Sequence, residues 1–476
     1  MAVTRRDVLT GVLAAAASGM VGRALAGQGR AERRLTAAPA RVALVGSDRP
    51  ETAVWAYDGE VPGPVLRFRQ GERVRIVVEN RLPGETTVHW HGLRVPNAMD
   101  GVPHLTQPPI PPGGQFVYEF DLPDAGTFWY HPHVRSHEQV ERGLAGAFIV
   151  EERTPPDVDR DIVWVIDDWR LTPEAEIAPD FDAFFDASHA GRLGNTVTVN
   201  GRLPTALAVR RNERLRLRLV NVSNARILGL VFEGHVPTVI ALDGQPVAPH
   251  APAGGRIVLG PAMRADIVLD MTAEPGRSYA VLDTFYPNGA YRLTDITYEK
   301  SAPVRPRPLT AAVALPANPI PAPELDRAER HTIEFGGGMM DPKLMRAMQA
   351  GSLSQADVAA VRERMRAGRI WTINGQSVLG HAHEPLLTLR RGRSYVLALR
   401  NETAWHHPMH LHGTAFHVVS RNGRPLLRRV LQDTILMAPG ETAEIAFVAD
   451  EPGDWMFHCH ILEHQAAGMM GTFRIS

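Results

Sequence analysis

The sequence of 476 residues contains a single cysteine, Cys459, so no disulfide can form within the chain. Beyond a short apolar run near the N-terminus, it has no hydrophobic stretch long enough to cross a membrane. The 51 Lys and Arg residues balance the 52 Asp and Glu residues, and no basic run or tail stands out. These absences exclude a disulfide-stapled scaffold and a membrane-spanning protein, and they predict that there is no nucleic-acid partner.

Proline and glycine, by contrast, are frequent. The chain has 38 prolines and 42 glycines, a composition that favours turn-rich β structure over long helices. Its length is too great for one ordinary hydrophobic core and predicts two to four domains. We therefore expect a soluble multidomain β protein, and we expect it to be a monomer.

The first residues have the features of an export signal. Arg5 and Arg6 precede the short apolar run, and a small-residue Ala-Leu-Ala sequence follows it. Residues 1–26 are predicted to be a twin-arginine signal peptide, which implies a periplasmic or secreted protein; a disordered tail with a chance arginine pair is the alternative. A lone thiol in an exported protein is a reactive liability unless something, such as a metal, binds it.

Three segments of the chain follow one plan. The stretches "VWAYDGEVPGPVLRFRQGERVRIVVEN", "VTVNGRLPTALAVRRNERLRLRLVN" and "IWTINGQSVLGHAHEPLLTLRRGRSYVLALRN" each join an Asp-Gly or Asn-Gly turn to an alternating strand that ends in Asn. Short alternating strands cut by Gly and Pro are typical of β-sandwiches and barrels. We therefore predict an all-β chain with domains at residues 40–152, 158–300 and 331–476, and a Pro-rich linker at 301–330.

Histidine pairs occur in two of the three copies. When the copies are aligned on the shared asparagine, the first and third have a His-X-His pair where the middle copy has Leu230 and Phe232. A second repeated block shows the same contrast. Histidines that the shared framework needed would occur in all three copies, so these serve another purpose. The four pairs are His89/His91, His131/His133, His410/His412 and His458/His460.

The spacing of these pairs indicates two metal sites. Alternate residues of a strand point to the same side, so each pair directs two imidazoles at one place. Four pairs can supply eight neutral imidazoles to a pocket between the first and third domains, a set that suits three copper ions. Cys459 must point the other way from its two histidine neighbours, and His407, His464 and Met469 can join it. Two His, one Cys and a weak axial Met are the ligands of a blue-copper electron-transfer site.

A single His-X-His pair would be weak support, because on an exposed strand it usually has no special role. The repetition at matched positions is what indicates copper. Ten of the 20 histidines fall in these motifs, and the others, such as His104 and His137, are interpreted as ordinary surface or core residues.

The motifs "HWHG", "WYHPH", "HPMHLHG" and "HCHILEHQAAGMM" resemble the four copper-binding signatures of the three-domain multicopper oxidases, the bacterial laccase and cuprous oxidase group. The resemblance extends over essentially the whole chain after the signal segment. It implies three cupredoxin-like Greek-key domains and four copper ions: one type 1, one type 2 and two type 3. It also implies that a small reducing substrate, aromatic or Cu(I), is oxidised by single electrons while O2 is reduced to water.

The resemblance also implies roles for individual residues. His89 and His410 would hold the type 2 copper, and Asp100 matches an acid of the family's proton relay. Cys459 and its neighbours His458 and His460 would connect the two copper sites. The type 3 ions would be held by His91, His131 and His460 and by His133, His412 and His458, and the type 1 copper by His407, Cys459, His464 and Met469.

The chain departs from the family pattern at two places. Many bacterial relatives have a proton-delivering glutamate directly after the type 1 histidine, where this chain has Gln465; Glu463 is not equivalent by spacing. Cuprous oxidases use an Asp and a Met just before the type 1 histidine to bind substrate copper, and these positions are Thr403 and Trp405 here. The usual site for substrate copper is therefore not expected.

The substrate is left open by the sequence. Met339, Met340, Met345 and Met348 either bind Cu(I) or substrate in a lid or pack a core. In the second case Leu344, Met345 and Met348, at helical spacing, would form the buried face of a short helix. An aromatic donor needs access to the edge of a type 1 histidine. Our interpretation is a laccase-like oxidase of aromatic or metal-ion substrates, with a cuprous oxidase for copper tolerance as the alternative. A copper nitrite reductase is disfavoured because it lacks the full eight-histidine cluster, and a non-enzymatic scaffold because every ligand position is retained.

Overall fold

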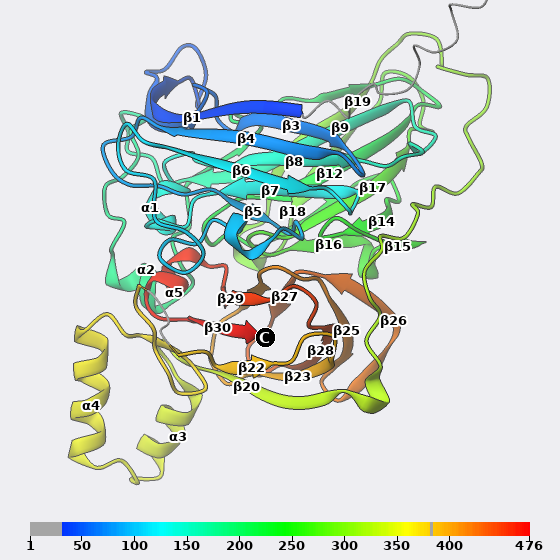
Figure 1. Ribbon diagram of the computed structural model, residues 1–476. Helices are drawn as coiled ribbons and strands as arrows, with labels where there is room; N and C mark the ends of the chain where they lie inside the picture. Colours follow the sequence, from blue (N-terminus) through cyan, green and yellow to red (C-terminus); the bar gives the residue numbers. More distant parts are fainter. Residues whose placement is uncertain (1–30, 381–383) are drawn as a thin grey trace, which may run out of the picture.

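The computed structural model describes residues 31–380 and 384–476, so the predicted signal peptide lies outside the described residues. The described chain consists mainly of strands arranged in six sheets, two for each of three consecutive units (Figure 1). No helix in these ranges is long and apolar enough to cross a membrane. The all-β prediction is confirmed.

The first unit contains two four-stranded sheets. Its elements are β1 (Ala31–Val42), β2 (Thr52–Tyr57), β3 (Gly63–Arg69), β4 (Arg73–Asn80), β5 (His89–His91), the short 3-10 helix η1 (Asn97–Met99), β6 (Gln115–Asp121), β7 (Gly126–His131), α1 (Ser136–Gln139) and β8 (Gly146–Glu151). The sheet orders are β2-β1-β4-β6 and β3-β8-β7-β5. Alternate residues of β4, Val74, Ile76 and Val78, are buried with Trp90 and Phe148 between the sheets.

The second unit contains a six-stranded and a five-stranded sheet. Its elements are β9 (Arg160–Trp169), α2 (Phe184–Ser188), β10 (Thr196–Val199), β11 (Leu207–Val209), β12 (Arg214–Asn221), β13 (Leu228–Phe232), β14 (Thr238–Leu242), β15 (Gln245–His250), η2 (Ala253–Gly255), β16 (Arg256–Leu259), β17 (Arg264–Asp270), β18 (Ser278–Asp283), η3 (Pro287–Gly289) and β19 (Tyr291–Tyr298). The orders are β10-β9-β12-β17-β14-β15 and β11-β19-β18-β13-β16. Leu230 and Phe232, which replace a histidine pair, are buried in this unit's apolar core.

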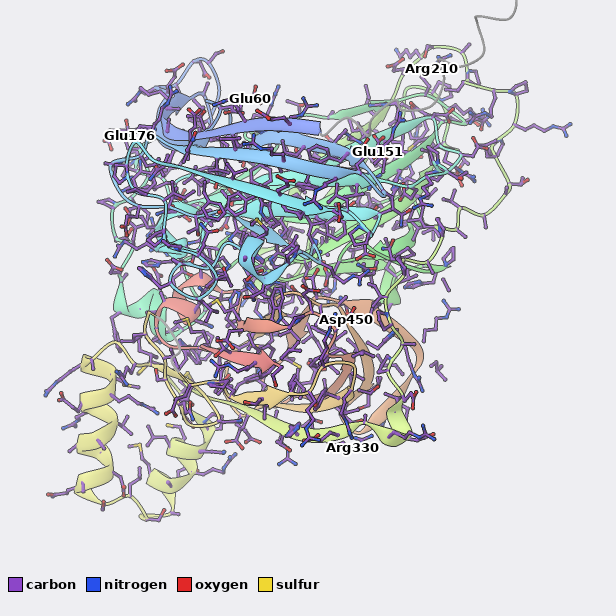
Figure 2. All side chains as sticks on the ribbon, viewed as in Figure 1. Glu60, Glu151, Glu176, Arg210, Arg330 and Asp450 are labelled. Carbon is purple, nitrogen blue, oxygen red and sulfur yellow. The ribbon has the colours of Figure 1, made fainter. Side chains whose placement is uncertain are left out.

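The third unit has the same arrangement and adds two helices. Its elements are η4 (Leu325–Arg327), β20 (Glu329–Gly337), α3 (Pro342–Gln349), α4 (Gln355–Arg366), β21 (Trp371–Ile373), β22 (Leu387–Leu389), β23 (Ser394–Asn401), β24 (His407–Leu411), β25 (Phe416–Arg421), β26 (Arg424–Gln432), β27 (Thr434–Met437), β28 (Thr442–Val448), β29 (Gly453–Cys459), α5 (Leu462–Ala466) and β30 (Met470–Ile475). The orders are β21-β20-β23-β28-β25-β26 and β22-β30-β29-β24-β27. Helices α3 and α4 extend away from the sandwich, and their side chains project from it (Figure 2).

The repeated asparagine of the sequence has a structural role in all three units. Asn80, Asn221 and Asn401 each end the strand that pairs in parallel with the first strand of their unit. Each side-chain amide is buried and donates to two or more carbonyls of the following loops, for example from Asn80 Nδ2 to Gly84 O (2.9 Å) and Ile110 O (2.8 Å). The shared framework therefore depends on this amide, which fixes the loop between this strand and the next one in each unit.

Candidate metal centre

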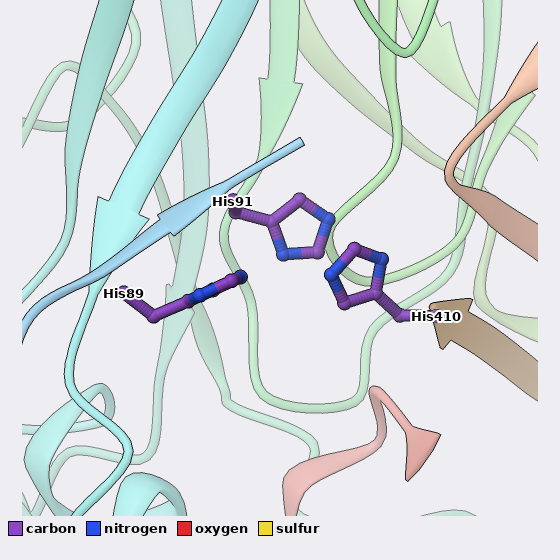
Figure 3. Close-up of side chains that lie close together, drawn as sticks. All are labelled: His89, His91 and His410. Carbon is purple, nitrogen blue, oxygen red and sulfur yellow. The ribbon is translucent and has the colours of Figure 1, made fainter. Parts of the chain in front are cut away.

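The eight cluster histidines meet between the first and third units. They come from β5, from β7 and the residues that follow it, and from the ends of β24 and β29, where His89 pairs with His131 and His410 with His458 across antiparallel strands. Each histidine is at most 6% exposed. Figure 3 shows His89 and His91 of β5 facing His410 of β24. The two strand pairs thus direct their imidazoles into one buried space.

Within this space the nitrogens form overlapping groups of three, with ligand atoms within 4.8 Å of one another. The groups are His89/His91/His410, His89/His133/His412, His91/His131/His460 and His410/His412/His458. The ligand atoms of the first type 3 triad, His91, His131 and His460, therefore lie close together. In the second, His412 and His458 approach to 3.1 Å between their Nε2 atoms, and the His133 ring centre lies 4.9 Å from that of His412 and 5.4 Å from that of His458.

The state of these nitrogens fits a metal. His89 Nε2, His91 Nδ1 and His410 Nε2 are buried and have no hydrogen-bond partner among the described residues, a costly arrangement unless a metal takes the lone pair. Burial, reinforced by the neighbouring imidazoles, lowers the pKa of His91, His133 and His412 well below the usual value, so the rings are neutral ligands. A cluster of neutral imidazoles suits copper.

Two carboxylates hold the outer nitrogens of the cluster. Asp100 places Oδ2 at 2.9 Å from His412 Nδ1 and Oδ1 at 3.2 Å from His89 Nδ1, so one predicted residue contacts two ligands. Asp433 places Oδ1 at 3.1 Å from His91 Nε2, and its carbonyl lies 2.9 Å from His410 Nδ1. Such contacts fix the tautomer and orientation of a ligating ring.

Sequence reasoning missed Asp433 and its partner from the middle unit. Arg264 of β17 is fully buried and donates from Nη1 to Asp433 Oδ1 at 2.9 Å. Asp243 accepts from the Arg264 and Thr434 backbone N–H groups. The unit without cluster histidines therefore supports the cluster from outside. No sequence signal pointed to these residues, because they belong to no repeated motif.

Cys459 lies on the opposite side of β29 from His458. Its Sγ is 3.5 Å from His407 Nδ1 and 3.7 Å from His464 Nδ1, and these two nitrogens are 3.2 Å apart. The backbone N–H of Cys459 donates to the carbonyl of Met469, whose side chain is buried in the same core. Burial raises the pKa of the thiol, so a bound metal would have to displace its proton. The structure thus brings together His407, Cys459 and His464 of the predicted second pocket.

The outer nitrogens of this second pocket are both occupied. His407 Nε2 lies 2.8 Å from the Thr403 hydroxyl, and His464 Nε2 donates to the carbonyl of His189 at 2.7 Å. Both rings are 0% exposed. Thr403 and the His189 carbonyl of the middle unit therefore occupy the outer nitrogens of the two histidines, so a donor can reach the imidazole edges only across these covering groups.

Glu463 and Gln465, the residues on either side of His464, have different surroundings. Glu463 is buried, and its carboxylate accepts from the Arg192 N–H (3.1 Å) and from Asn224 Nδ2 (2.8 Å). Gln465 instead lines a cavity of about 200 Å³ together with His133, and its buried Oε1 has no partner among the described residues. Gln465, and not Glu463, therefore shares a cavity with a cluster histidine.

The methionine segment forms a helix whose methionines face outward. Met345 and Met348 of α3 are 45% and 59% exposed, and Met340 just before it is 62% exposed. The alternative that the methionines pack a core, with Met345 and Met348 on a buried helix face, is therefore wrong for these three residues. Met339 is partly buried, and its backbone N–H donates to Ser188 O.

Comparison with known proteins agrees with this geometry. Sequence models of the multicopper oxidase family match residues 41–155, 160–299 and 352–476. The chain is 29% identical to Multicopper oxidase MmcO of Mycobacterium tuberculosis over 91% of this chain and 85% of that protein. It is 29% identical to Laccase-2 of Fomitopsis schrenkii (86% and 84% covered) and 26% identical to Copper resistance protein A of Escherichia coli (93% and 92% covered).

Solved structures give the same result. A multi-copper oxidase from Pseudomonas thermotolerans is 33% identical, with a TM-score of 0.80 and 94% of this chain and 99% of that chain covered. Lac15 from a marine microbial metagenome is 36% identical, with a TM-score of 0.72 and 93% and 100% covered. The chain belongs to the multicopper oxidase family. It is an oxidase built from three cupredoxin-like domains, and its family implies four copper ions.

Proposed function

We propose that this multicopper oxidase is laccase-like and oxidises small aromatic donors, phenols or aryl amines, at the Cys459 site. The observation that supports this choice over Cu(I) is that the two positions that bind substrate copper in cuprous oxidases lack metal-ligating side chains. Thr403 and Trp405, in place of the Asp and Met of cuprous oxidases, are engaged with the protein: Thr403 with His407, and Trp405 Nε1 with the Met339 carbonyl at 2.8 Å. The laccase among the relatives is in line with this proposal.

In this proposal His407, Cys459, His464 and Met469 hold the type 1 copper, and the eight cluster histidines hold the other three in the arrangement that the family resemblance implies. Copper at these sites would supply one-electron oxidation of the donor and reduction of O2 to water. The residues of the chain orient the ligands: the His189 carbonyl holds the His464 proton on Nε2 and leaves Nδ1 free to face Cys459.

Asp100 is the acid that we propose to hand protons to the cluster, since its carboxylate contacts His89 and His412 directly. Gln465 beside His133 cannot ionise and can only relay a hydrogen bond. Proton delivery therefore depends on the Asp100 side of the cluster.

A cuprous oxidase is the second candidate, supported by the three exposed methionines at 340, 345 and 348. Copper resistance protein A among the relatives is compatible with it. We further propose twin-arginine export of residues 1–26, a periplasmic or secreted monomer, and domain bounds at 40–152, 158–300 and 331–476 joined by the linker at 301–330.

The test is a copper count together with O2 consumption. We expect four coppers per chain, a blue protein, and O2 uptake with 2,6-dimethoxyphenol that exceeds the uptake with Cu(I). Fewer than two coppers would contradict the oxidase assignment and revive the scaffold. Faster turnover with Cu(I) than with the phenol would favour the second candidate.

A further inference from the structure

A segment of the middle domain, residues 184–189, covers the pocket of His407, Cys459 and His464 and is held there by hydrogen bonds. Three consecutive carbonyls of this segment accept hydrogen bonds from the third domain, which fixes its position. The pairs are Trp371 Nε1 to Ala187 O (2.6 Å), Met339 N to Ser188 O (2.9 Å) and His464 Nε2 to His189 O (2.7 Å).

This cover separates any donor from the type 1 imidazoles. His407 and His464 are 0% exposed, and their outer nitrogens are held by Thr403 and His189. An electron from outside must therefore cross the covering layer. The hydrogen bond between the His189 carbonyl and His464 is a direct connection through that layer.

The outer side of the cover is aromatic. The ring of His189 stacks on Phe185, with ring centres 4.1 Å apart and 18° between planes, and meets Trp405 edge-on at 5.2 Å. Phe185 is 67% exposed, although phenylalanine is among the residues most often buried. Its i,i+4 position relative to His189 places the two rings on one face of the α2 turn. The Phe185 ring thus faces solvent. The other ring of the stack belongs to His189, whose backbone carbonyl accepts the hydrogen bond from His464.

We propose that the aromatic donor docks by stacking on Phe185 beside His189, and that its electron reaches the type 1 site through His189. This inference rests on the proposed laccase-like function. The donor, a phenol or aryl amine, loses one electron to the type 1 site and one proton to solvent, and becomes a radical. The final electron acceptor is O2, which the proposed activity consumes.

An alternative binding site for the aromatic donor is a cavity of about 290 Å³ beside α4, lined by Phe184, Ala187, Met365 and Ile370. Phe184 is 52% exposed and precedes Phe185 in the chain, so it provides a matched control. The ring contact to His189 belongs to Phe185.

The experiment compares Phe185→Ala, Phe185→Tyr and Phe184→Ala holoenzymes with 2,6-dimethoxyphenol and hexacyanoferrate(II) as donors. We expect kcat/KM for the phenol to fall about tenfold in Phe185→Ala, the loss of one stacking contact. Phe185→Tyr should restore it and Phe184→Ala should leave it unchanged. Hexacyanoferrate(II) oxidation, copper content and the blue absorption should stay unchanged in all three, because the backbone carbonyl of His189 remains.

Three results would overturn the docking site. The first is unchanged phenol oxidation in Phe185→Ala, and the second is a loss confined to Phe184→Ala, which would place the donor in the cavity. The third is an equal loss for both donors or a weakened blue absorption in Phe185→Ala, which would show a structural effect. A wild-type protein that oxidises neither donor would instead contradict the proposed function itself.

Discussion

The guanidinium of Arg264 and the carboxylate of Asp433 form a fully buried ion pair that joins the domain without cluster histidines to the cluster, with Nη1 and Oδ1 2.9 Å apart. The same carboxylate oxygen lies 3.1 Å from His91 Nε2. The middle domain therefore does more than separate the other two, because it supplies the positive charge that keeps a buried carboxylate ionised beside a proposed copper ligand. Burial raises the pKa of Asp433, and the charge of Arg264 more than offsets this, so that its pKa is lowered.

Removal of that charge should destabilise the protein and the cluster together. Arg264→Leu leaves Asp433 buried without its partner, which costs on the order of 3–5 kcal/mol. We expect a lower free energy of unfolding in urea and a loss of cluster copper, while the blue type 1 absorption is retained. Arg330→Gln is the control, since Arg330 pairs with Glu444 at an exposed site and should matter by less than about 1 kcal/mol. Full copper content in Arg264→Leu would contradict the supporting role of the pair.

Cys459→Ser should separate the two copper sites. The hydroxyl cannot replace the thiolate that gives a His₂Cys site its colour, so the blue absorption and most oxidase activity should be lost. His458 and His460 point to the other side of the strand, so most of the cluster copper should stay. Absorption spectra and a copper count check this. A variant that stays intensely blue would refute the assignment of Cys459.

Copper removal should lower the melting temperature, because the cluster nitrogens of His89, His91 and His410 would again lack partners. Copper that is added back should restore the melting temperature in a concentration-dependent way. The control is Leu230→Met in the middle domain, which should cost less than about 1.5 kcal/mol and shift the apo and holo forms equally. Equal melting temperatures with and without copper would argue against a buried metal cluster.

Gln465→Glu should raise turnover. A carboxylate in the cavity beside His133 can transfer protons, whereas the amide cannot, and general acid–base catalysis contributes about a hundredfold at the low end of its range. We expect an increase in kcat up to that size with an unchanged blue absorption. Gln465→Leu, similar in size but unable to ionise, should give no increase. The same kcat in both variants would show that protons do not pass this side of the cluster.

The exposed methionines should affect the oxidation of Cu(I) and not the stability of the fold. Leucine at positions 340, 345 and 348 together removes the thioethers but keeps apolar side chains of similar size. Because these residues are 62%, 45% and 59% exposed, the melting temperature should stay the same. If the segment binds Cu(I), Cu(I) oxidation should fall while phenol oxidation holds. Parallel loss of both activities with a lower melting temperature would show that the methionines pack against the protein.

Much of this protein can be predicted from local sequence. The repeated asparagine and the alternating strands predict the all-β fold, because a strand's two-residue period appears directly in the order of residues. The same period separates Cys459 from His458 and His460, so the two pockets on opposite sides of β29 follow from three consecutive residues. Leu230 and Phe232 also identify the middle domain as the one without cluster histidines.

Other features were decided by tertiary structure alone. Arg264 is 169 residues from Asp433, and His189 is 275 residues from His464, so no local pattern links either pair. The exposure of Met345 depends on where α3 lies relative to the sandwich, and its helical spacing alone suggested the opposite. Local sequence fixes which way a side chain points from its own strand or helix, whereas a contact between domains depends on how the three units pack against one another.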